Sequence, residues 1–163
     1  MCDAERYDTQ AVKDRLNAYR EADQEISNQT EYLERLISRM EGLGAKEITD
    51  MPRSPSPSVD RISGLMNQKI EIEECIAEDV AALEAERKAI ESILKHLQRA
   101  DERAVIRFRY LMGLDWYEVA DAMYGGRTDY LDKEESYLKR VFRLHGSALL
   151  SIAVYLKEEA EPE

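Results

Sequence analysis

The segment "DMPRSPSPS" at residues 50–58 decides the fold, because it contains three of the four prolines in the chain. Proline has no backbone N–H and blocks the interior of a helix, so no helix runs through this segment. Gly42 and Gly44 stand just before it and favour the end of a helix. The sequence therefore predicts a Pro/Ser-rich loop at 42–58 with a long helix on each side.

Apolar residues recur in steps of three and four on both sides of this loop, which is the heptad pattern of a coiled coil. The first seam consists of Val12, Leu16, Tyr19, Asp23, Ile26, Thr30, Leu33, Ile37 and Met40. The second consists of Ile62, Leu65, Lys69, Ile72, Ile76, Val80, Leu83, Arg87, Ile90, Leu94 and Leu97. Each helix is roughly 45–55 Å long at about 1.5 Å per residue. Their similar length predicts a long antiparallel hairpin over residues 10–97.

Four apolar residues lie outside these seams: Leu36, Met66, Ile70 and Ile93. A hairpin of two helices covers each seam from one side only, so we expect these side chains to dock elsewhere. A homodimer formed through the N-terminal helices and packing against the C-terminal module are both open. The alternative is that these residues only widen the stripe buried within one chain.

Composition supports an all-α chain and limits its function. The 163 residues are 44% apolar, 7% aromatic and 35% charged, which is typical of long solvent-facing helices. The net charge of −11 repels phosphate, so only a local patch can bind nucleic acid. The sequence has no signal peptide, no apolar run of transmembrane length and no CxxC pair, so we expect a protein of the reducing cytoplasm without a membrane partner.

The chemistry-bearing residues show no catalytic or metal-binding pattern. His96 and His145 are the only histidines, and neither stands at metal-ligand spacing from Cys or carboxylates. We expect surface or capping roles for both. No phosphate-binding GK[ST] motif follows the glycines at 125–126. The sequence therefore predicts a protein that is not an enzyme and has no metal or cofactor.

Residues 101–157 predict several shorter helices. Asp101 is placed to cap the first, whose expected apolar face is Ala104, Val105, Phe108, Leu111 and Met112, and Gly113 suits the left-handed position after it. Asp115 with Glu118 forms an acidic capping box for a short helix that stops at Gly125-Gly126, and Asp132 with Glu135 opens the last helix, 133–157.

The last helix, 133–157, has two distinct faces at about 100° per residue. One is apolar: Tyr137, Val141, Leu144, Ala148, Ile152 and Tyr155. The other is basic and hydroxyl-bearing: Ser136, Lys139, Arg140, Arg143 and Ser147. A helix that buries one face and offers a compact cationic face suits the DNA major groove. A second basic run, Arg103, Arg107 and Arg109, is placed to reach flanking phosphates. Basic stripes are also common on solvated surfaces, so the pattern leaves both readings open.

The motifs "LDWYEVADAMYG" (114–125) and "YLKRVFRLHGSALLSI" (137–152) resemble the fourth-region helix-turn-helix of bacterial sigma factors. Over most of residues 15–157 the chain resembles a family of small phage- and prophage-encoded proteins of unknown function, described as sigma-like and related to phage late-gene transcription regulators. The resemblance implies that Val141, Leu144, Ala148 and Leu149 pack, that Tyr137, Lys139, Arg140 and Arg143 face DNA, and that RNA polymerase is a partner. The helical count instead buries Tyr137.

One departure from that pattern is "GGRTDYLDKEE" (125–135), which puts about ten residues where a helix-turn-helix has a turn of three or four. It is either a wing that contacts the DNA backbone through Arg127 or a change in docking angle.

Together the residues and the resemblance predict a sequence-specific DNA-binding transcriptional regulator, with a helical hairpin at 10–97 and a helix-turn-helix domain at 101–157. The alternative is a non-enzymatic coiled-coil adaptor whose C-terminal helices only pack. In the first case we expect Trp116, the only tryptophan, to be structural and not to touch DNA.

Overall fold

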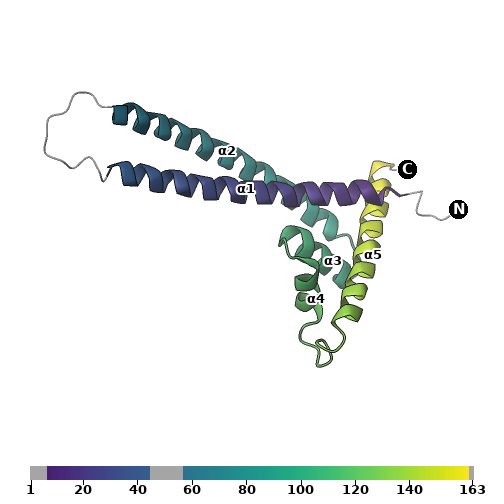
Figure 1. Cartoon of the computed structure of the whole chain (residues 1–163). Helices are drawn as coiled ribbons and strands as arrows, with labels where there is room; N and C mark the ends of the chain where they lie inside the picture. The colour runs from purple at the N-terminus through teal and green to yellow at the C-terminus, as the bar shows by residue number, and fades with distance from the viewer. Residues whose placement is uncertain (1–6, 45–56, 162–163) are drawn as a thin grey trace. The chain divides into compact units, whose positions relative to one another are not determined.

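The computed structural model describes residues 7–44 and 57–161, and every regular element in these ranges is helical. The elements are α1 (Thr9–Gly44), α2 (Pro57–Leu94), α3 (Ala100–Ile106), the π-helical turn η2 (Arg107–Leu111), α4 (Trp116–Tyr124) and α5 (Glu134–Ala160) (Figure 1). The all-α class with a long N-terminal hairpin and a C-terminal helix-turn-helix is confirmed. Most of the predicted loop, residues 45–56, lies outside the described residues.

The chain divides into two compact units. Residues 22–84 form one, which we call the hairpin arm, and residues 1–21 with 85–163 form the other, which we call the base unit. The predicted domains separate near residue 100 instead. The difference arises because the start of α1 and the end of α2 contribute buried side chains to the same unit as α3, α4 and α5.

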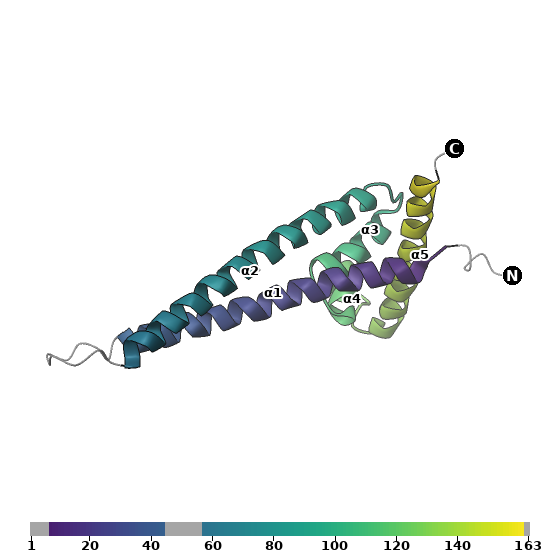
Figure 2. The same cartoon turned by 90° about the horizontal axis from the view of Figure 1, so that it is seen from above.

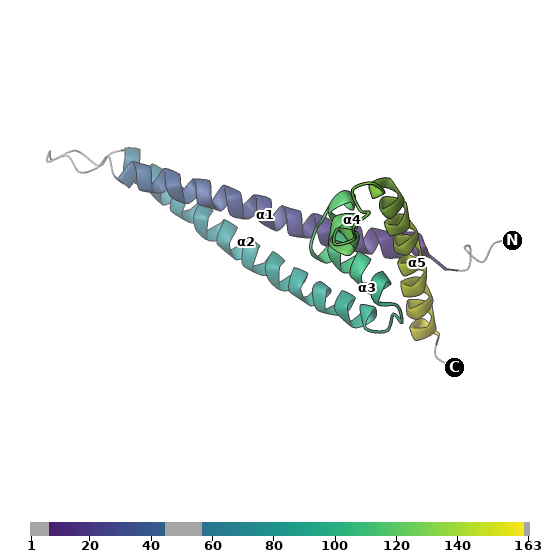
Figure 3. The ribbon, with the colours of Figure 1, turned by 90° about the horizontal axis from the view of Figure 1, so that it is seen from below.

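In the hairpin arm, α1 and α2 run side by side and antiparallel (Figures 2 and 3). The seam residues Ile26, Leu33 and Ile72 are only half-buried, as expected when a helix has one neighbour. Met66 and Ile70 stay 50% and 48% exposed. The expectation that Leu36 docks outside the hairpin is wrong, because Leu36 is only 1% exposed and belongs to the core of the arm. At this level the buried stripe is wider than the heptad seam.

The core of the base unit draws on every helix of that unit. Its buried apolar residues are Val12, Leu16, Tyr19, Ile90, Leu94, Leu97, Val105, Ile106, Tyr110, Leu111, Val119, Ala120, Tyr124, Tyr130, Tyr137, Val141, Leu144, Ala148, Leu149, Ile152 and Ala153. α5 packs against both α3 and α4. Arg15 of α1 and Glu86 of α2 form a partly exposed ion pair within this unit.

The chain reverses after α3 through a wide helical turn. The Met112 N–H donates to the Arg107 carbonyl at 2.9 Å, five residues back, which defines the π turn. Gly113 then has φ +72°, and the Leu114 N–H donates to the Phe108 carbonyl at 3.0 Å, which confirms the predicted left-handed glycine. Met112 is 59% exposed, so its predicted place on the buried face is wrong. Because a π turn holds more residues than an α turn, the residues after it no longer follow the spacing of 3.6 residues per turn.

The predicted helix starts are right once and wrong twice. Asp115 accepts from the Glu118 N–H at 2.9 Å while Glu118 accepts from the Asp115 N–H at 2.8 Å, so the capping box of α4 is confirmed. The N-caps of α3 and α5 are Arg99 and Lys133, neither with a side-chain cap bond. Asp101 pairs with Arg99 at 3.2 Å instead of capping, and Asp132 is exposed.

His145 lies in the core and not on the surface, contrary to expectation. It is 8% exposed, and its Nε2 shares a 2.8 Å hydrogen bond with the Tyr110 hydroxyl. Burial lowers the pKa of His145 to about 4, and the positive charges of Lys13 and Arg109 add to the effect. The imidazole is therefore neutral at neutral pH.

This lowered pKa makes the stability of the base unit sensitive to mild acid. Unfolded histidine takes up a proton near pH 6.5, whereas folded His145 does so only near pH 4, so protonation favours the unfolded state between these values. The free energy of unfolding should fall by about 2 kcal/mol between pH 7 and pH 5 from this group alone. Urea unfolding followed by the fluorescence of Trp116, whose ring lies 4.9 Å from the His145 ring, measures it.

The matched control is His145→Gln, which cannot titrate in this range. Carboxylates titrate equally in both proteins, so the difference between their pH profiles isolates His145. Identical profiles would contradict the assignment of a neutral buried imidazole.

Candidate nucleic-acid interface

The two faces of α5 differ in the structure as they do in the sequence. Val141, Leu144, Ala148 and Ile152 are at most 6% exposed and face the core. Ser136, Lys139, Arg140 and Arg143 are exposed. We call these four residues the basic face of α5. Because the buried face fixes the rotation of α5 about its own axis, the direction in which the basic face points is fixed as well.

The cations of the basic face are not neutralised within the described part of the chain. Lys139, Arg140 and Arg143 make none of the ion pairs found there, and no acidic residue occurs between Ser136 and Leu156. Three positive charges on one exposed stretch of helix repel one another mildly and attract anions. In a chain of net charge −11, this is a local positive patch.

Tyr137 and Ser147 are not on that surface. Tyr137 is 8% exposed, and its hydroxyl donates to the Asp129 carboxylate at 2.8 Å. The helical count placed Tyr137 correctly, and the DNA-facing position implied by the resemblance does not match its burial. Ser147 is half-buried and donates to the Glu102 carboxylate at 2.5 Å. We therefore leave both out of the candidate interface.

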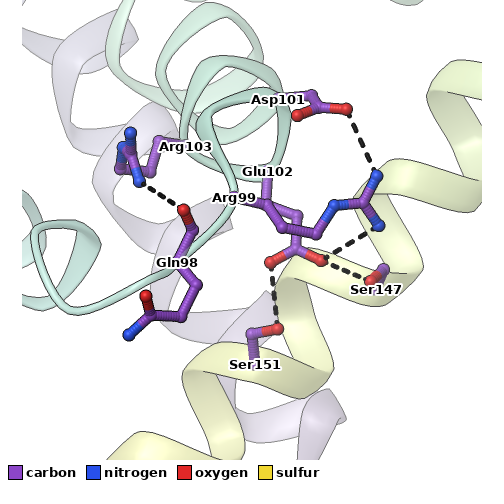
Figure 4. A network of polar contacts seen from close by, with 7 residues as sticks. All are labelled: Gln98, Arg99, Asp101, Glu102, Arg103, Ser147 and Ser151. Carbon is purple, nitrogen blue, oxygen red and sulfur yellow. Dashed lines mark hydrogen bonds and ion pairs between the residues drawn. The ribbon is translucent and has the colours of Figure 1, made fainter.

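Glu102 is the centre of a polar network between α3 and α5 (Figure 4). It is only 3% exposed, and it accepts hydrogen bonds from Ser147 at 2.5 Å and Ser151 at 3.0 Å, with Arg99 Nη1 3.9 Å away. A buried carboxylate without such partners would be strongly destabilising. Serines one helical turn apart on α5 are the sequence signal for this network, but their partner lies 45 residues away from Ser147.

The second basic run is committed to bonds within the base unit. Arg103 donates to the Leu97 carbonyl at 2.6 Å, and Arg107 donates to both carboxylate oxygens of Glu91, the shortest contact being 2.7 Å. Arg109 is half-buried. These bonds hold both guanidinium groups against neighbouring residues of the base unit, and Glu91 neutralises the charge of Arg107. We therefore do not include Arg103 or Arg107 in the candidate interface.

The turn between α4 and α5, residues 125–133, is tightly anchored (Figure 1). Tyr130 is 5% exposed, and its ring lies 5.7 Å from that of Tyr137, which also stacks at 5.0 Å on Tyr124. At Gly125 a Cβ would lie 2.5 Å from the Asp121 carbonyl oxygen, so only glycine fits there. Arg127 is exposed, and its guanidinium carbon lies 5.5 Å from the ring centroid of Tyr124 in this tyrosine cluster of Tyr124, Tyr130 and Tyr137. The wing that contacts the DNA backbone and the changed docking angle both stay predictions.

Comparisons with known proteins add nothing to this geometry, since no family model, no curated protein and no solved structure matches the chain. Within residues 7–44 and 57–161, no helix is long and apolar enough to cross a membrane.

Trp116, at the start of α4, joins three elements of the base unit. Its ring meets Phe142 and His145 of α5 edge-on, at 5.0 and 4.9 Å, and the Arg109 guanidinium lies 4.5 Å from the ring centroid. Arg109 also donates to the Leu114 carbonyl at 2.9 Å. Trp116 is half-buried, so it lies at the edge of the core. We call its contacts with Phe142, His145 and Arg109 the Trp116 bracket.

We predict that Trp116→Ala destabilises the base unit by about 2–3 kcal/mol, below the 3–5 kcal/mol typical of a fully buried aromatic residue. Urea unfolding followed by circular dichroism measures this loss. The matched control is Tyr117→Ala at the neighbouring exposed position, which should change little because Tyr117 is 57% exposed. Equal stability of the Trp116 variant and the wild-type protein would show that the bracket contributes nothing.

Proposed function

We propose that the protein is a sequence-specific DNA-binding transcriptional regulator that contacts duplex DNA with the basic face of α5. The observation that carries this proposal is the exposure of Lys139, Arg140 and Arg143 on one stretch of helix, unpaired with any described acid, opposite a buried apolar face. A helix held in this way has the chemistry that insertion into the major groove requires.

The side chains of the basic face suit complementary tasks. An arginine can donate two parallel bonds to the guanine edge, a lysine can neutralise phosphate, and the Ser136 hydroxyl can bond to either a base or the backbone. Glu134 and Glu135 precede this face and are exposed. Their charges disfavour phosphate near the first turn of α5, so DNA should approach the face from Ser136 onward.

The proposal extends to partners that the resemblance to sigma factors implies. A region-four helix-turn-helix brings a promoter and RNA polymerase together, so we propose polymerase as a second partner of the base unit. The origin in a phage or prophage, where late genes need such regulators, belongs to the same proposal. Its support is the pair of motifs at 114–125 and 137–152, of which the first contains α4 and the second lies within α5.

The direct test is Lys139→Ala/Arg140→Ala/Arg143→Ala binding to duplexes selected from a random pool. Each lost phosphate contact should lower the log–log salt slope by about 0.9, and each lost base contact should cost about 1–3 kcal/mol at one position of the site. Fluorescence anisotropy titrations at several salt concentrations give both values. All three side chains are exposed, so the variant should stay folded.

A charge-matched control separates contact from net charge. Arg35→Ala/Arg39→Ala/Arg61→Ala removes the same number of exposed cations from the hairpin arm. It should bind the selected DNA almost as the wild-type protein does. Equal losses in the two triple variants, or no loss in either, would sink the assignment to α5.

A second function, self-association, is favoured by the exposed apolar side chains of the hairpin arm. Met66 and Ile70 lie one turn apart on α2 and are 50% and 48% exposed, and Tyr32 of α1 is 41% exposed. We propose that a second copy of the chain covers them, because a two-fold dimer buries the same exposed apolar side chains on both copies. If the base unit does not bind DNA, the protein is instead a coiled-coil adaptor that associates through this surface of the hairpin arm.

We predict that Ile70→Glu weakens this association, since the dimer would bury an unpaired carboxylate. Sedimentation velocity at tens of micromolar, a concentration suited to weak dimers, should show a dimer for the wild-type protein and a monomer for the variant. Gln68→Glu, which adds the same charge at an exposed position on another side of α2, should remain dimeric. A wild-type chain that is monomeric throughout this range would rule the dimer out.

A further inference from the structure

Two exposed arginines from different elements lie on one tyrosine ring. The guanidinium carbon of Arg127, in the turn after α4, is 5.5 Å from the ring centroid of Tyr124, and that of Arg140, on α5, is 5.2 Å from the same centroid. Arg127 is also 5.9 Å from the ring centroid of Tyr137. Both contacts are within the range of cation–π attraction.

The aromatic platform beneath these arginines is rigid. Tyr124 is 7% exposed and stacks on Tyr137 at 5.0 Å, which is 8% exposed. The Tyr137 hydroxyl is fixed by its bond to Asp129. The buried rings of α4 and α5 therefore favour the observed positions of the two guanidinium groups.

No carboxylate neutralises the pair within the part of the chain that is described. Neither Arg127 nor Arg140 makes an ion pair there. Of the two acids in the same turn, Asp129 is engaged by Lys133 at 3.0 Å and by Tyr137 at 2.8 Å, and Asp132 is exposed and belongs to none of these ion pairs. Each of these guanidinium groups is free of a carboxylate partner, so a phosphate placed beside either one would gain charge-assisted hydrogen bonds.

From this arrangement, and resting on the proposed DNA binding, we infer that Arg127 and Arg140 form a clamp for the phosphodiester backbone of duplex DNA and do not read bases. The Arg127 and Arg140 guanidinium groups are attracted to the Tyr124 ring beside the turn. Lys139 and Arg143 have no such contact among the described residues and can extend toward a groove. The clamp fixes the docking of α5, and sequence choice is left to Ser136, Lys139 and Arg143. Tyr124 is the positioning residue.

The test compares Arg127→Gln, Arg140→Gln and the double variant on two probes, a duplex selected from a random pool and a mixed-sequence duplex of equal length. The double variant should lower the salt slope by about 0.9 for each phosphate lost, and affinity should fall by the same factor on both probes. Arg143→Gln should instead weaken binding to the selected duplex more than to the mixed one. Arg39→Gln, an exposed arginine of the hairpin arm, is the matched control and should change neither quantity.

Variants of Tyr124 give a second test, in which the salt dependence of DNA binding is measured on a folded protein. Tyr124→Phe keeps the ring and should keep the wild-type slope, whereas Tyr124→Leu, which circular dichroism must show to be folded, should lower it toward that of the double arginine variant. An unchanged slope in the double arginine variant, or a changed preference between the two probes, would overturn the clamp while DNA binding stands. A wild-type protein that binds neither duplex would overturn the proposed function itself.

Discussion

Burial of the apolar face of α5 is the constraint on which the base unit depends. Val141 and Ala148 are fully buried, and the helix is fixed at three levels along its length. The tyrosine cluster holds its start, the Trp116 bracket and the Tyr110–His145 bond hold its middle, and the Glu102–Ser147–Ser151 network holds it to α3. With rotation and position both fixed, the side chains that remain outside are a defined surface. This surface is basic in a chain that is otherwise strongly acidic.

The two ends of that surface have different physical characters. Near the turn after α4, the cations rest on buried rings and lose little conformational freedom when they meet a phosphate. Farther along α5, Arg143 has no fixed contact among the described residues and keeps the reach that a base edge demands. Positioning and reading by separate residues is a common arrangement in DNA recognition, because backbone contacts carry no sequence information.

Local chemistry explains which features of the fold were predictable. The two long helices, the capping box at Asp115 and the left-handed Gly113 each depend on residues close in sequence, and each is present. The caps expected at Asp101 and Asp132 failed because neither residue occupies the cap position, which is Arg99 for α3 and Lys133 for α5. The π turn shifted the phase of the buried stripe after Arg107, so Tyr110 is buried and Met112 is exposed.

The candidate site was less predictable, since the partners of its residues lie far apart in sequence. Spacing identified the basic face of α5. No residue close in sequence to Ser147 or Arg107 indicates that Glu102 accepts a hydrogen bond from Ser147 or that Glu91 pairs with Arg107. The tyrosine cluster was missed for a similar reason. Its three rings come from α4, the turn and α5, and the turn read as an insert of unknown shape.

The most direct test of the account is amide chemical-shift mapping of the full-length, isotope-labelled chain titrated with a duplex selected from a random pool. The account predicts saturable shifts at residues 136, 139, 140 and 143 and at Arg127, with residues 22–84 unaffected by DNA. Shifts confined to the hairpin arm, or no shifts at DNA concentrations that saturate retention of the protein, would contradict the claim that α5 is the DNA-binding helix.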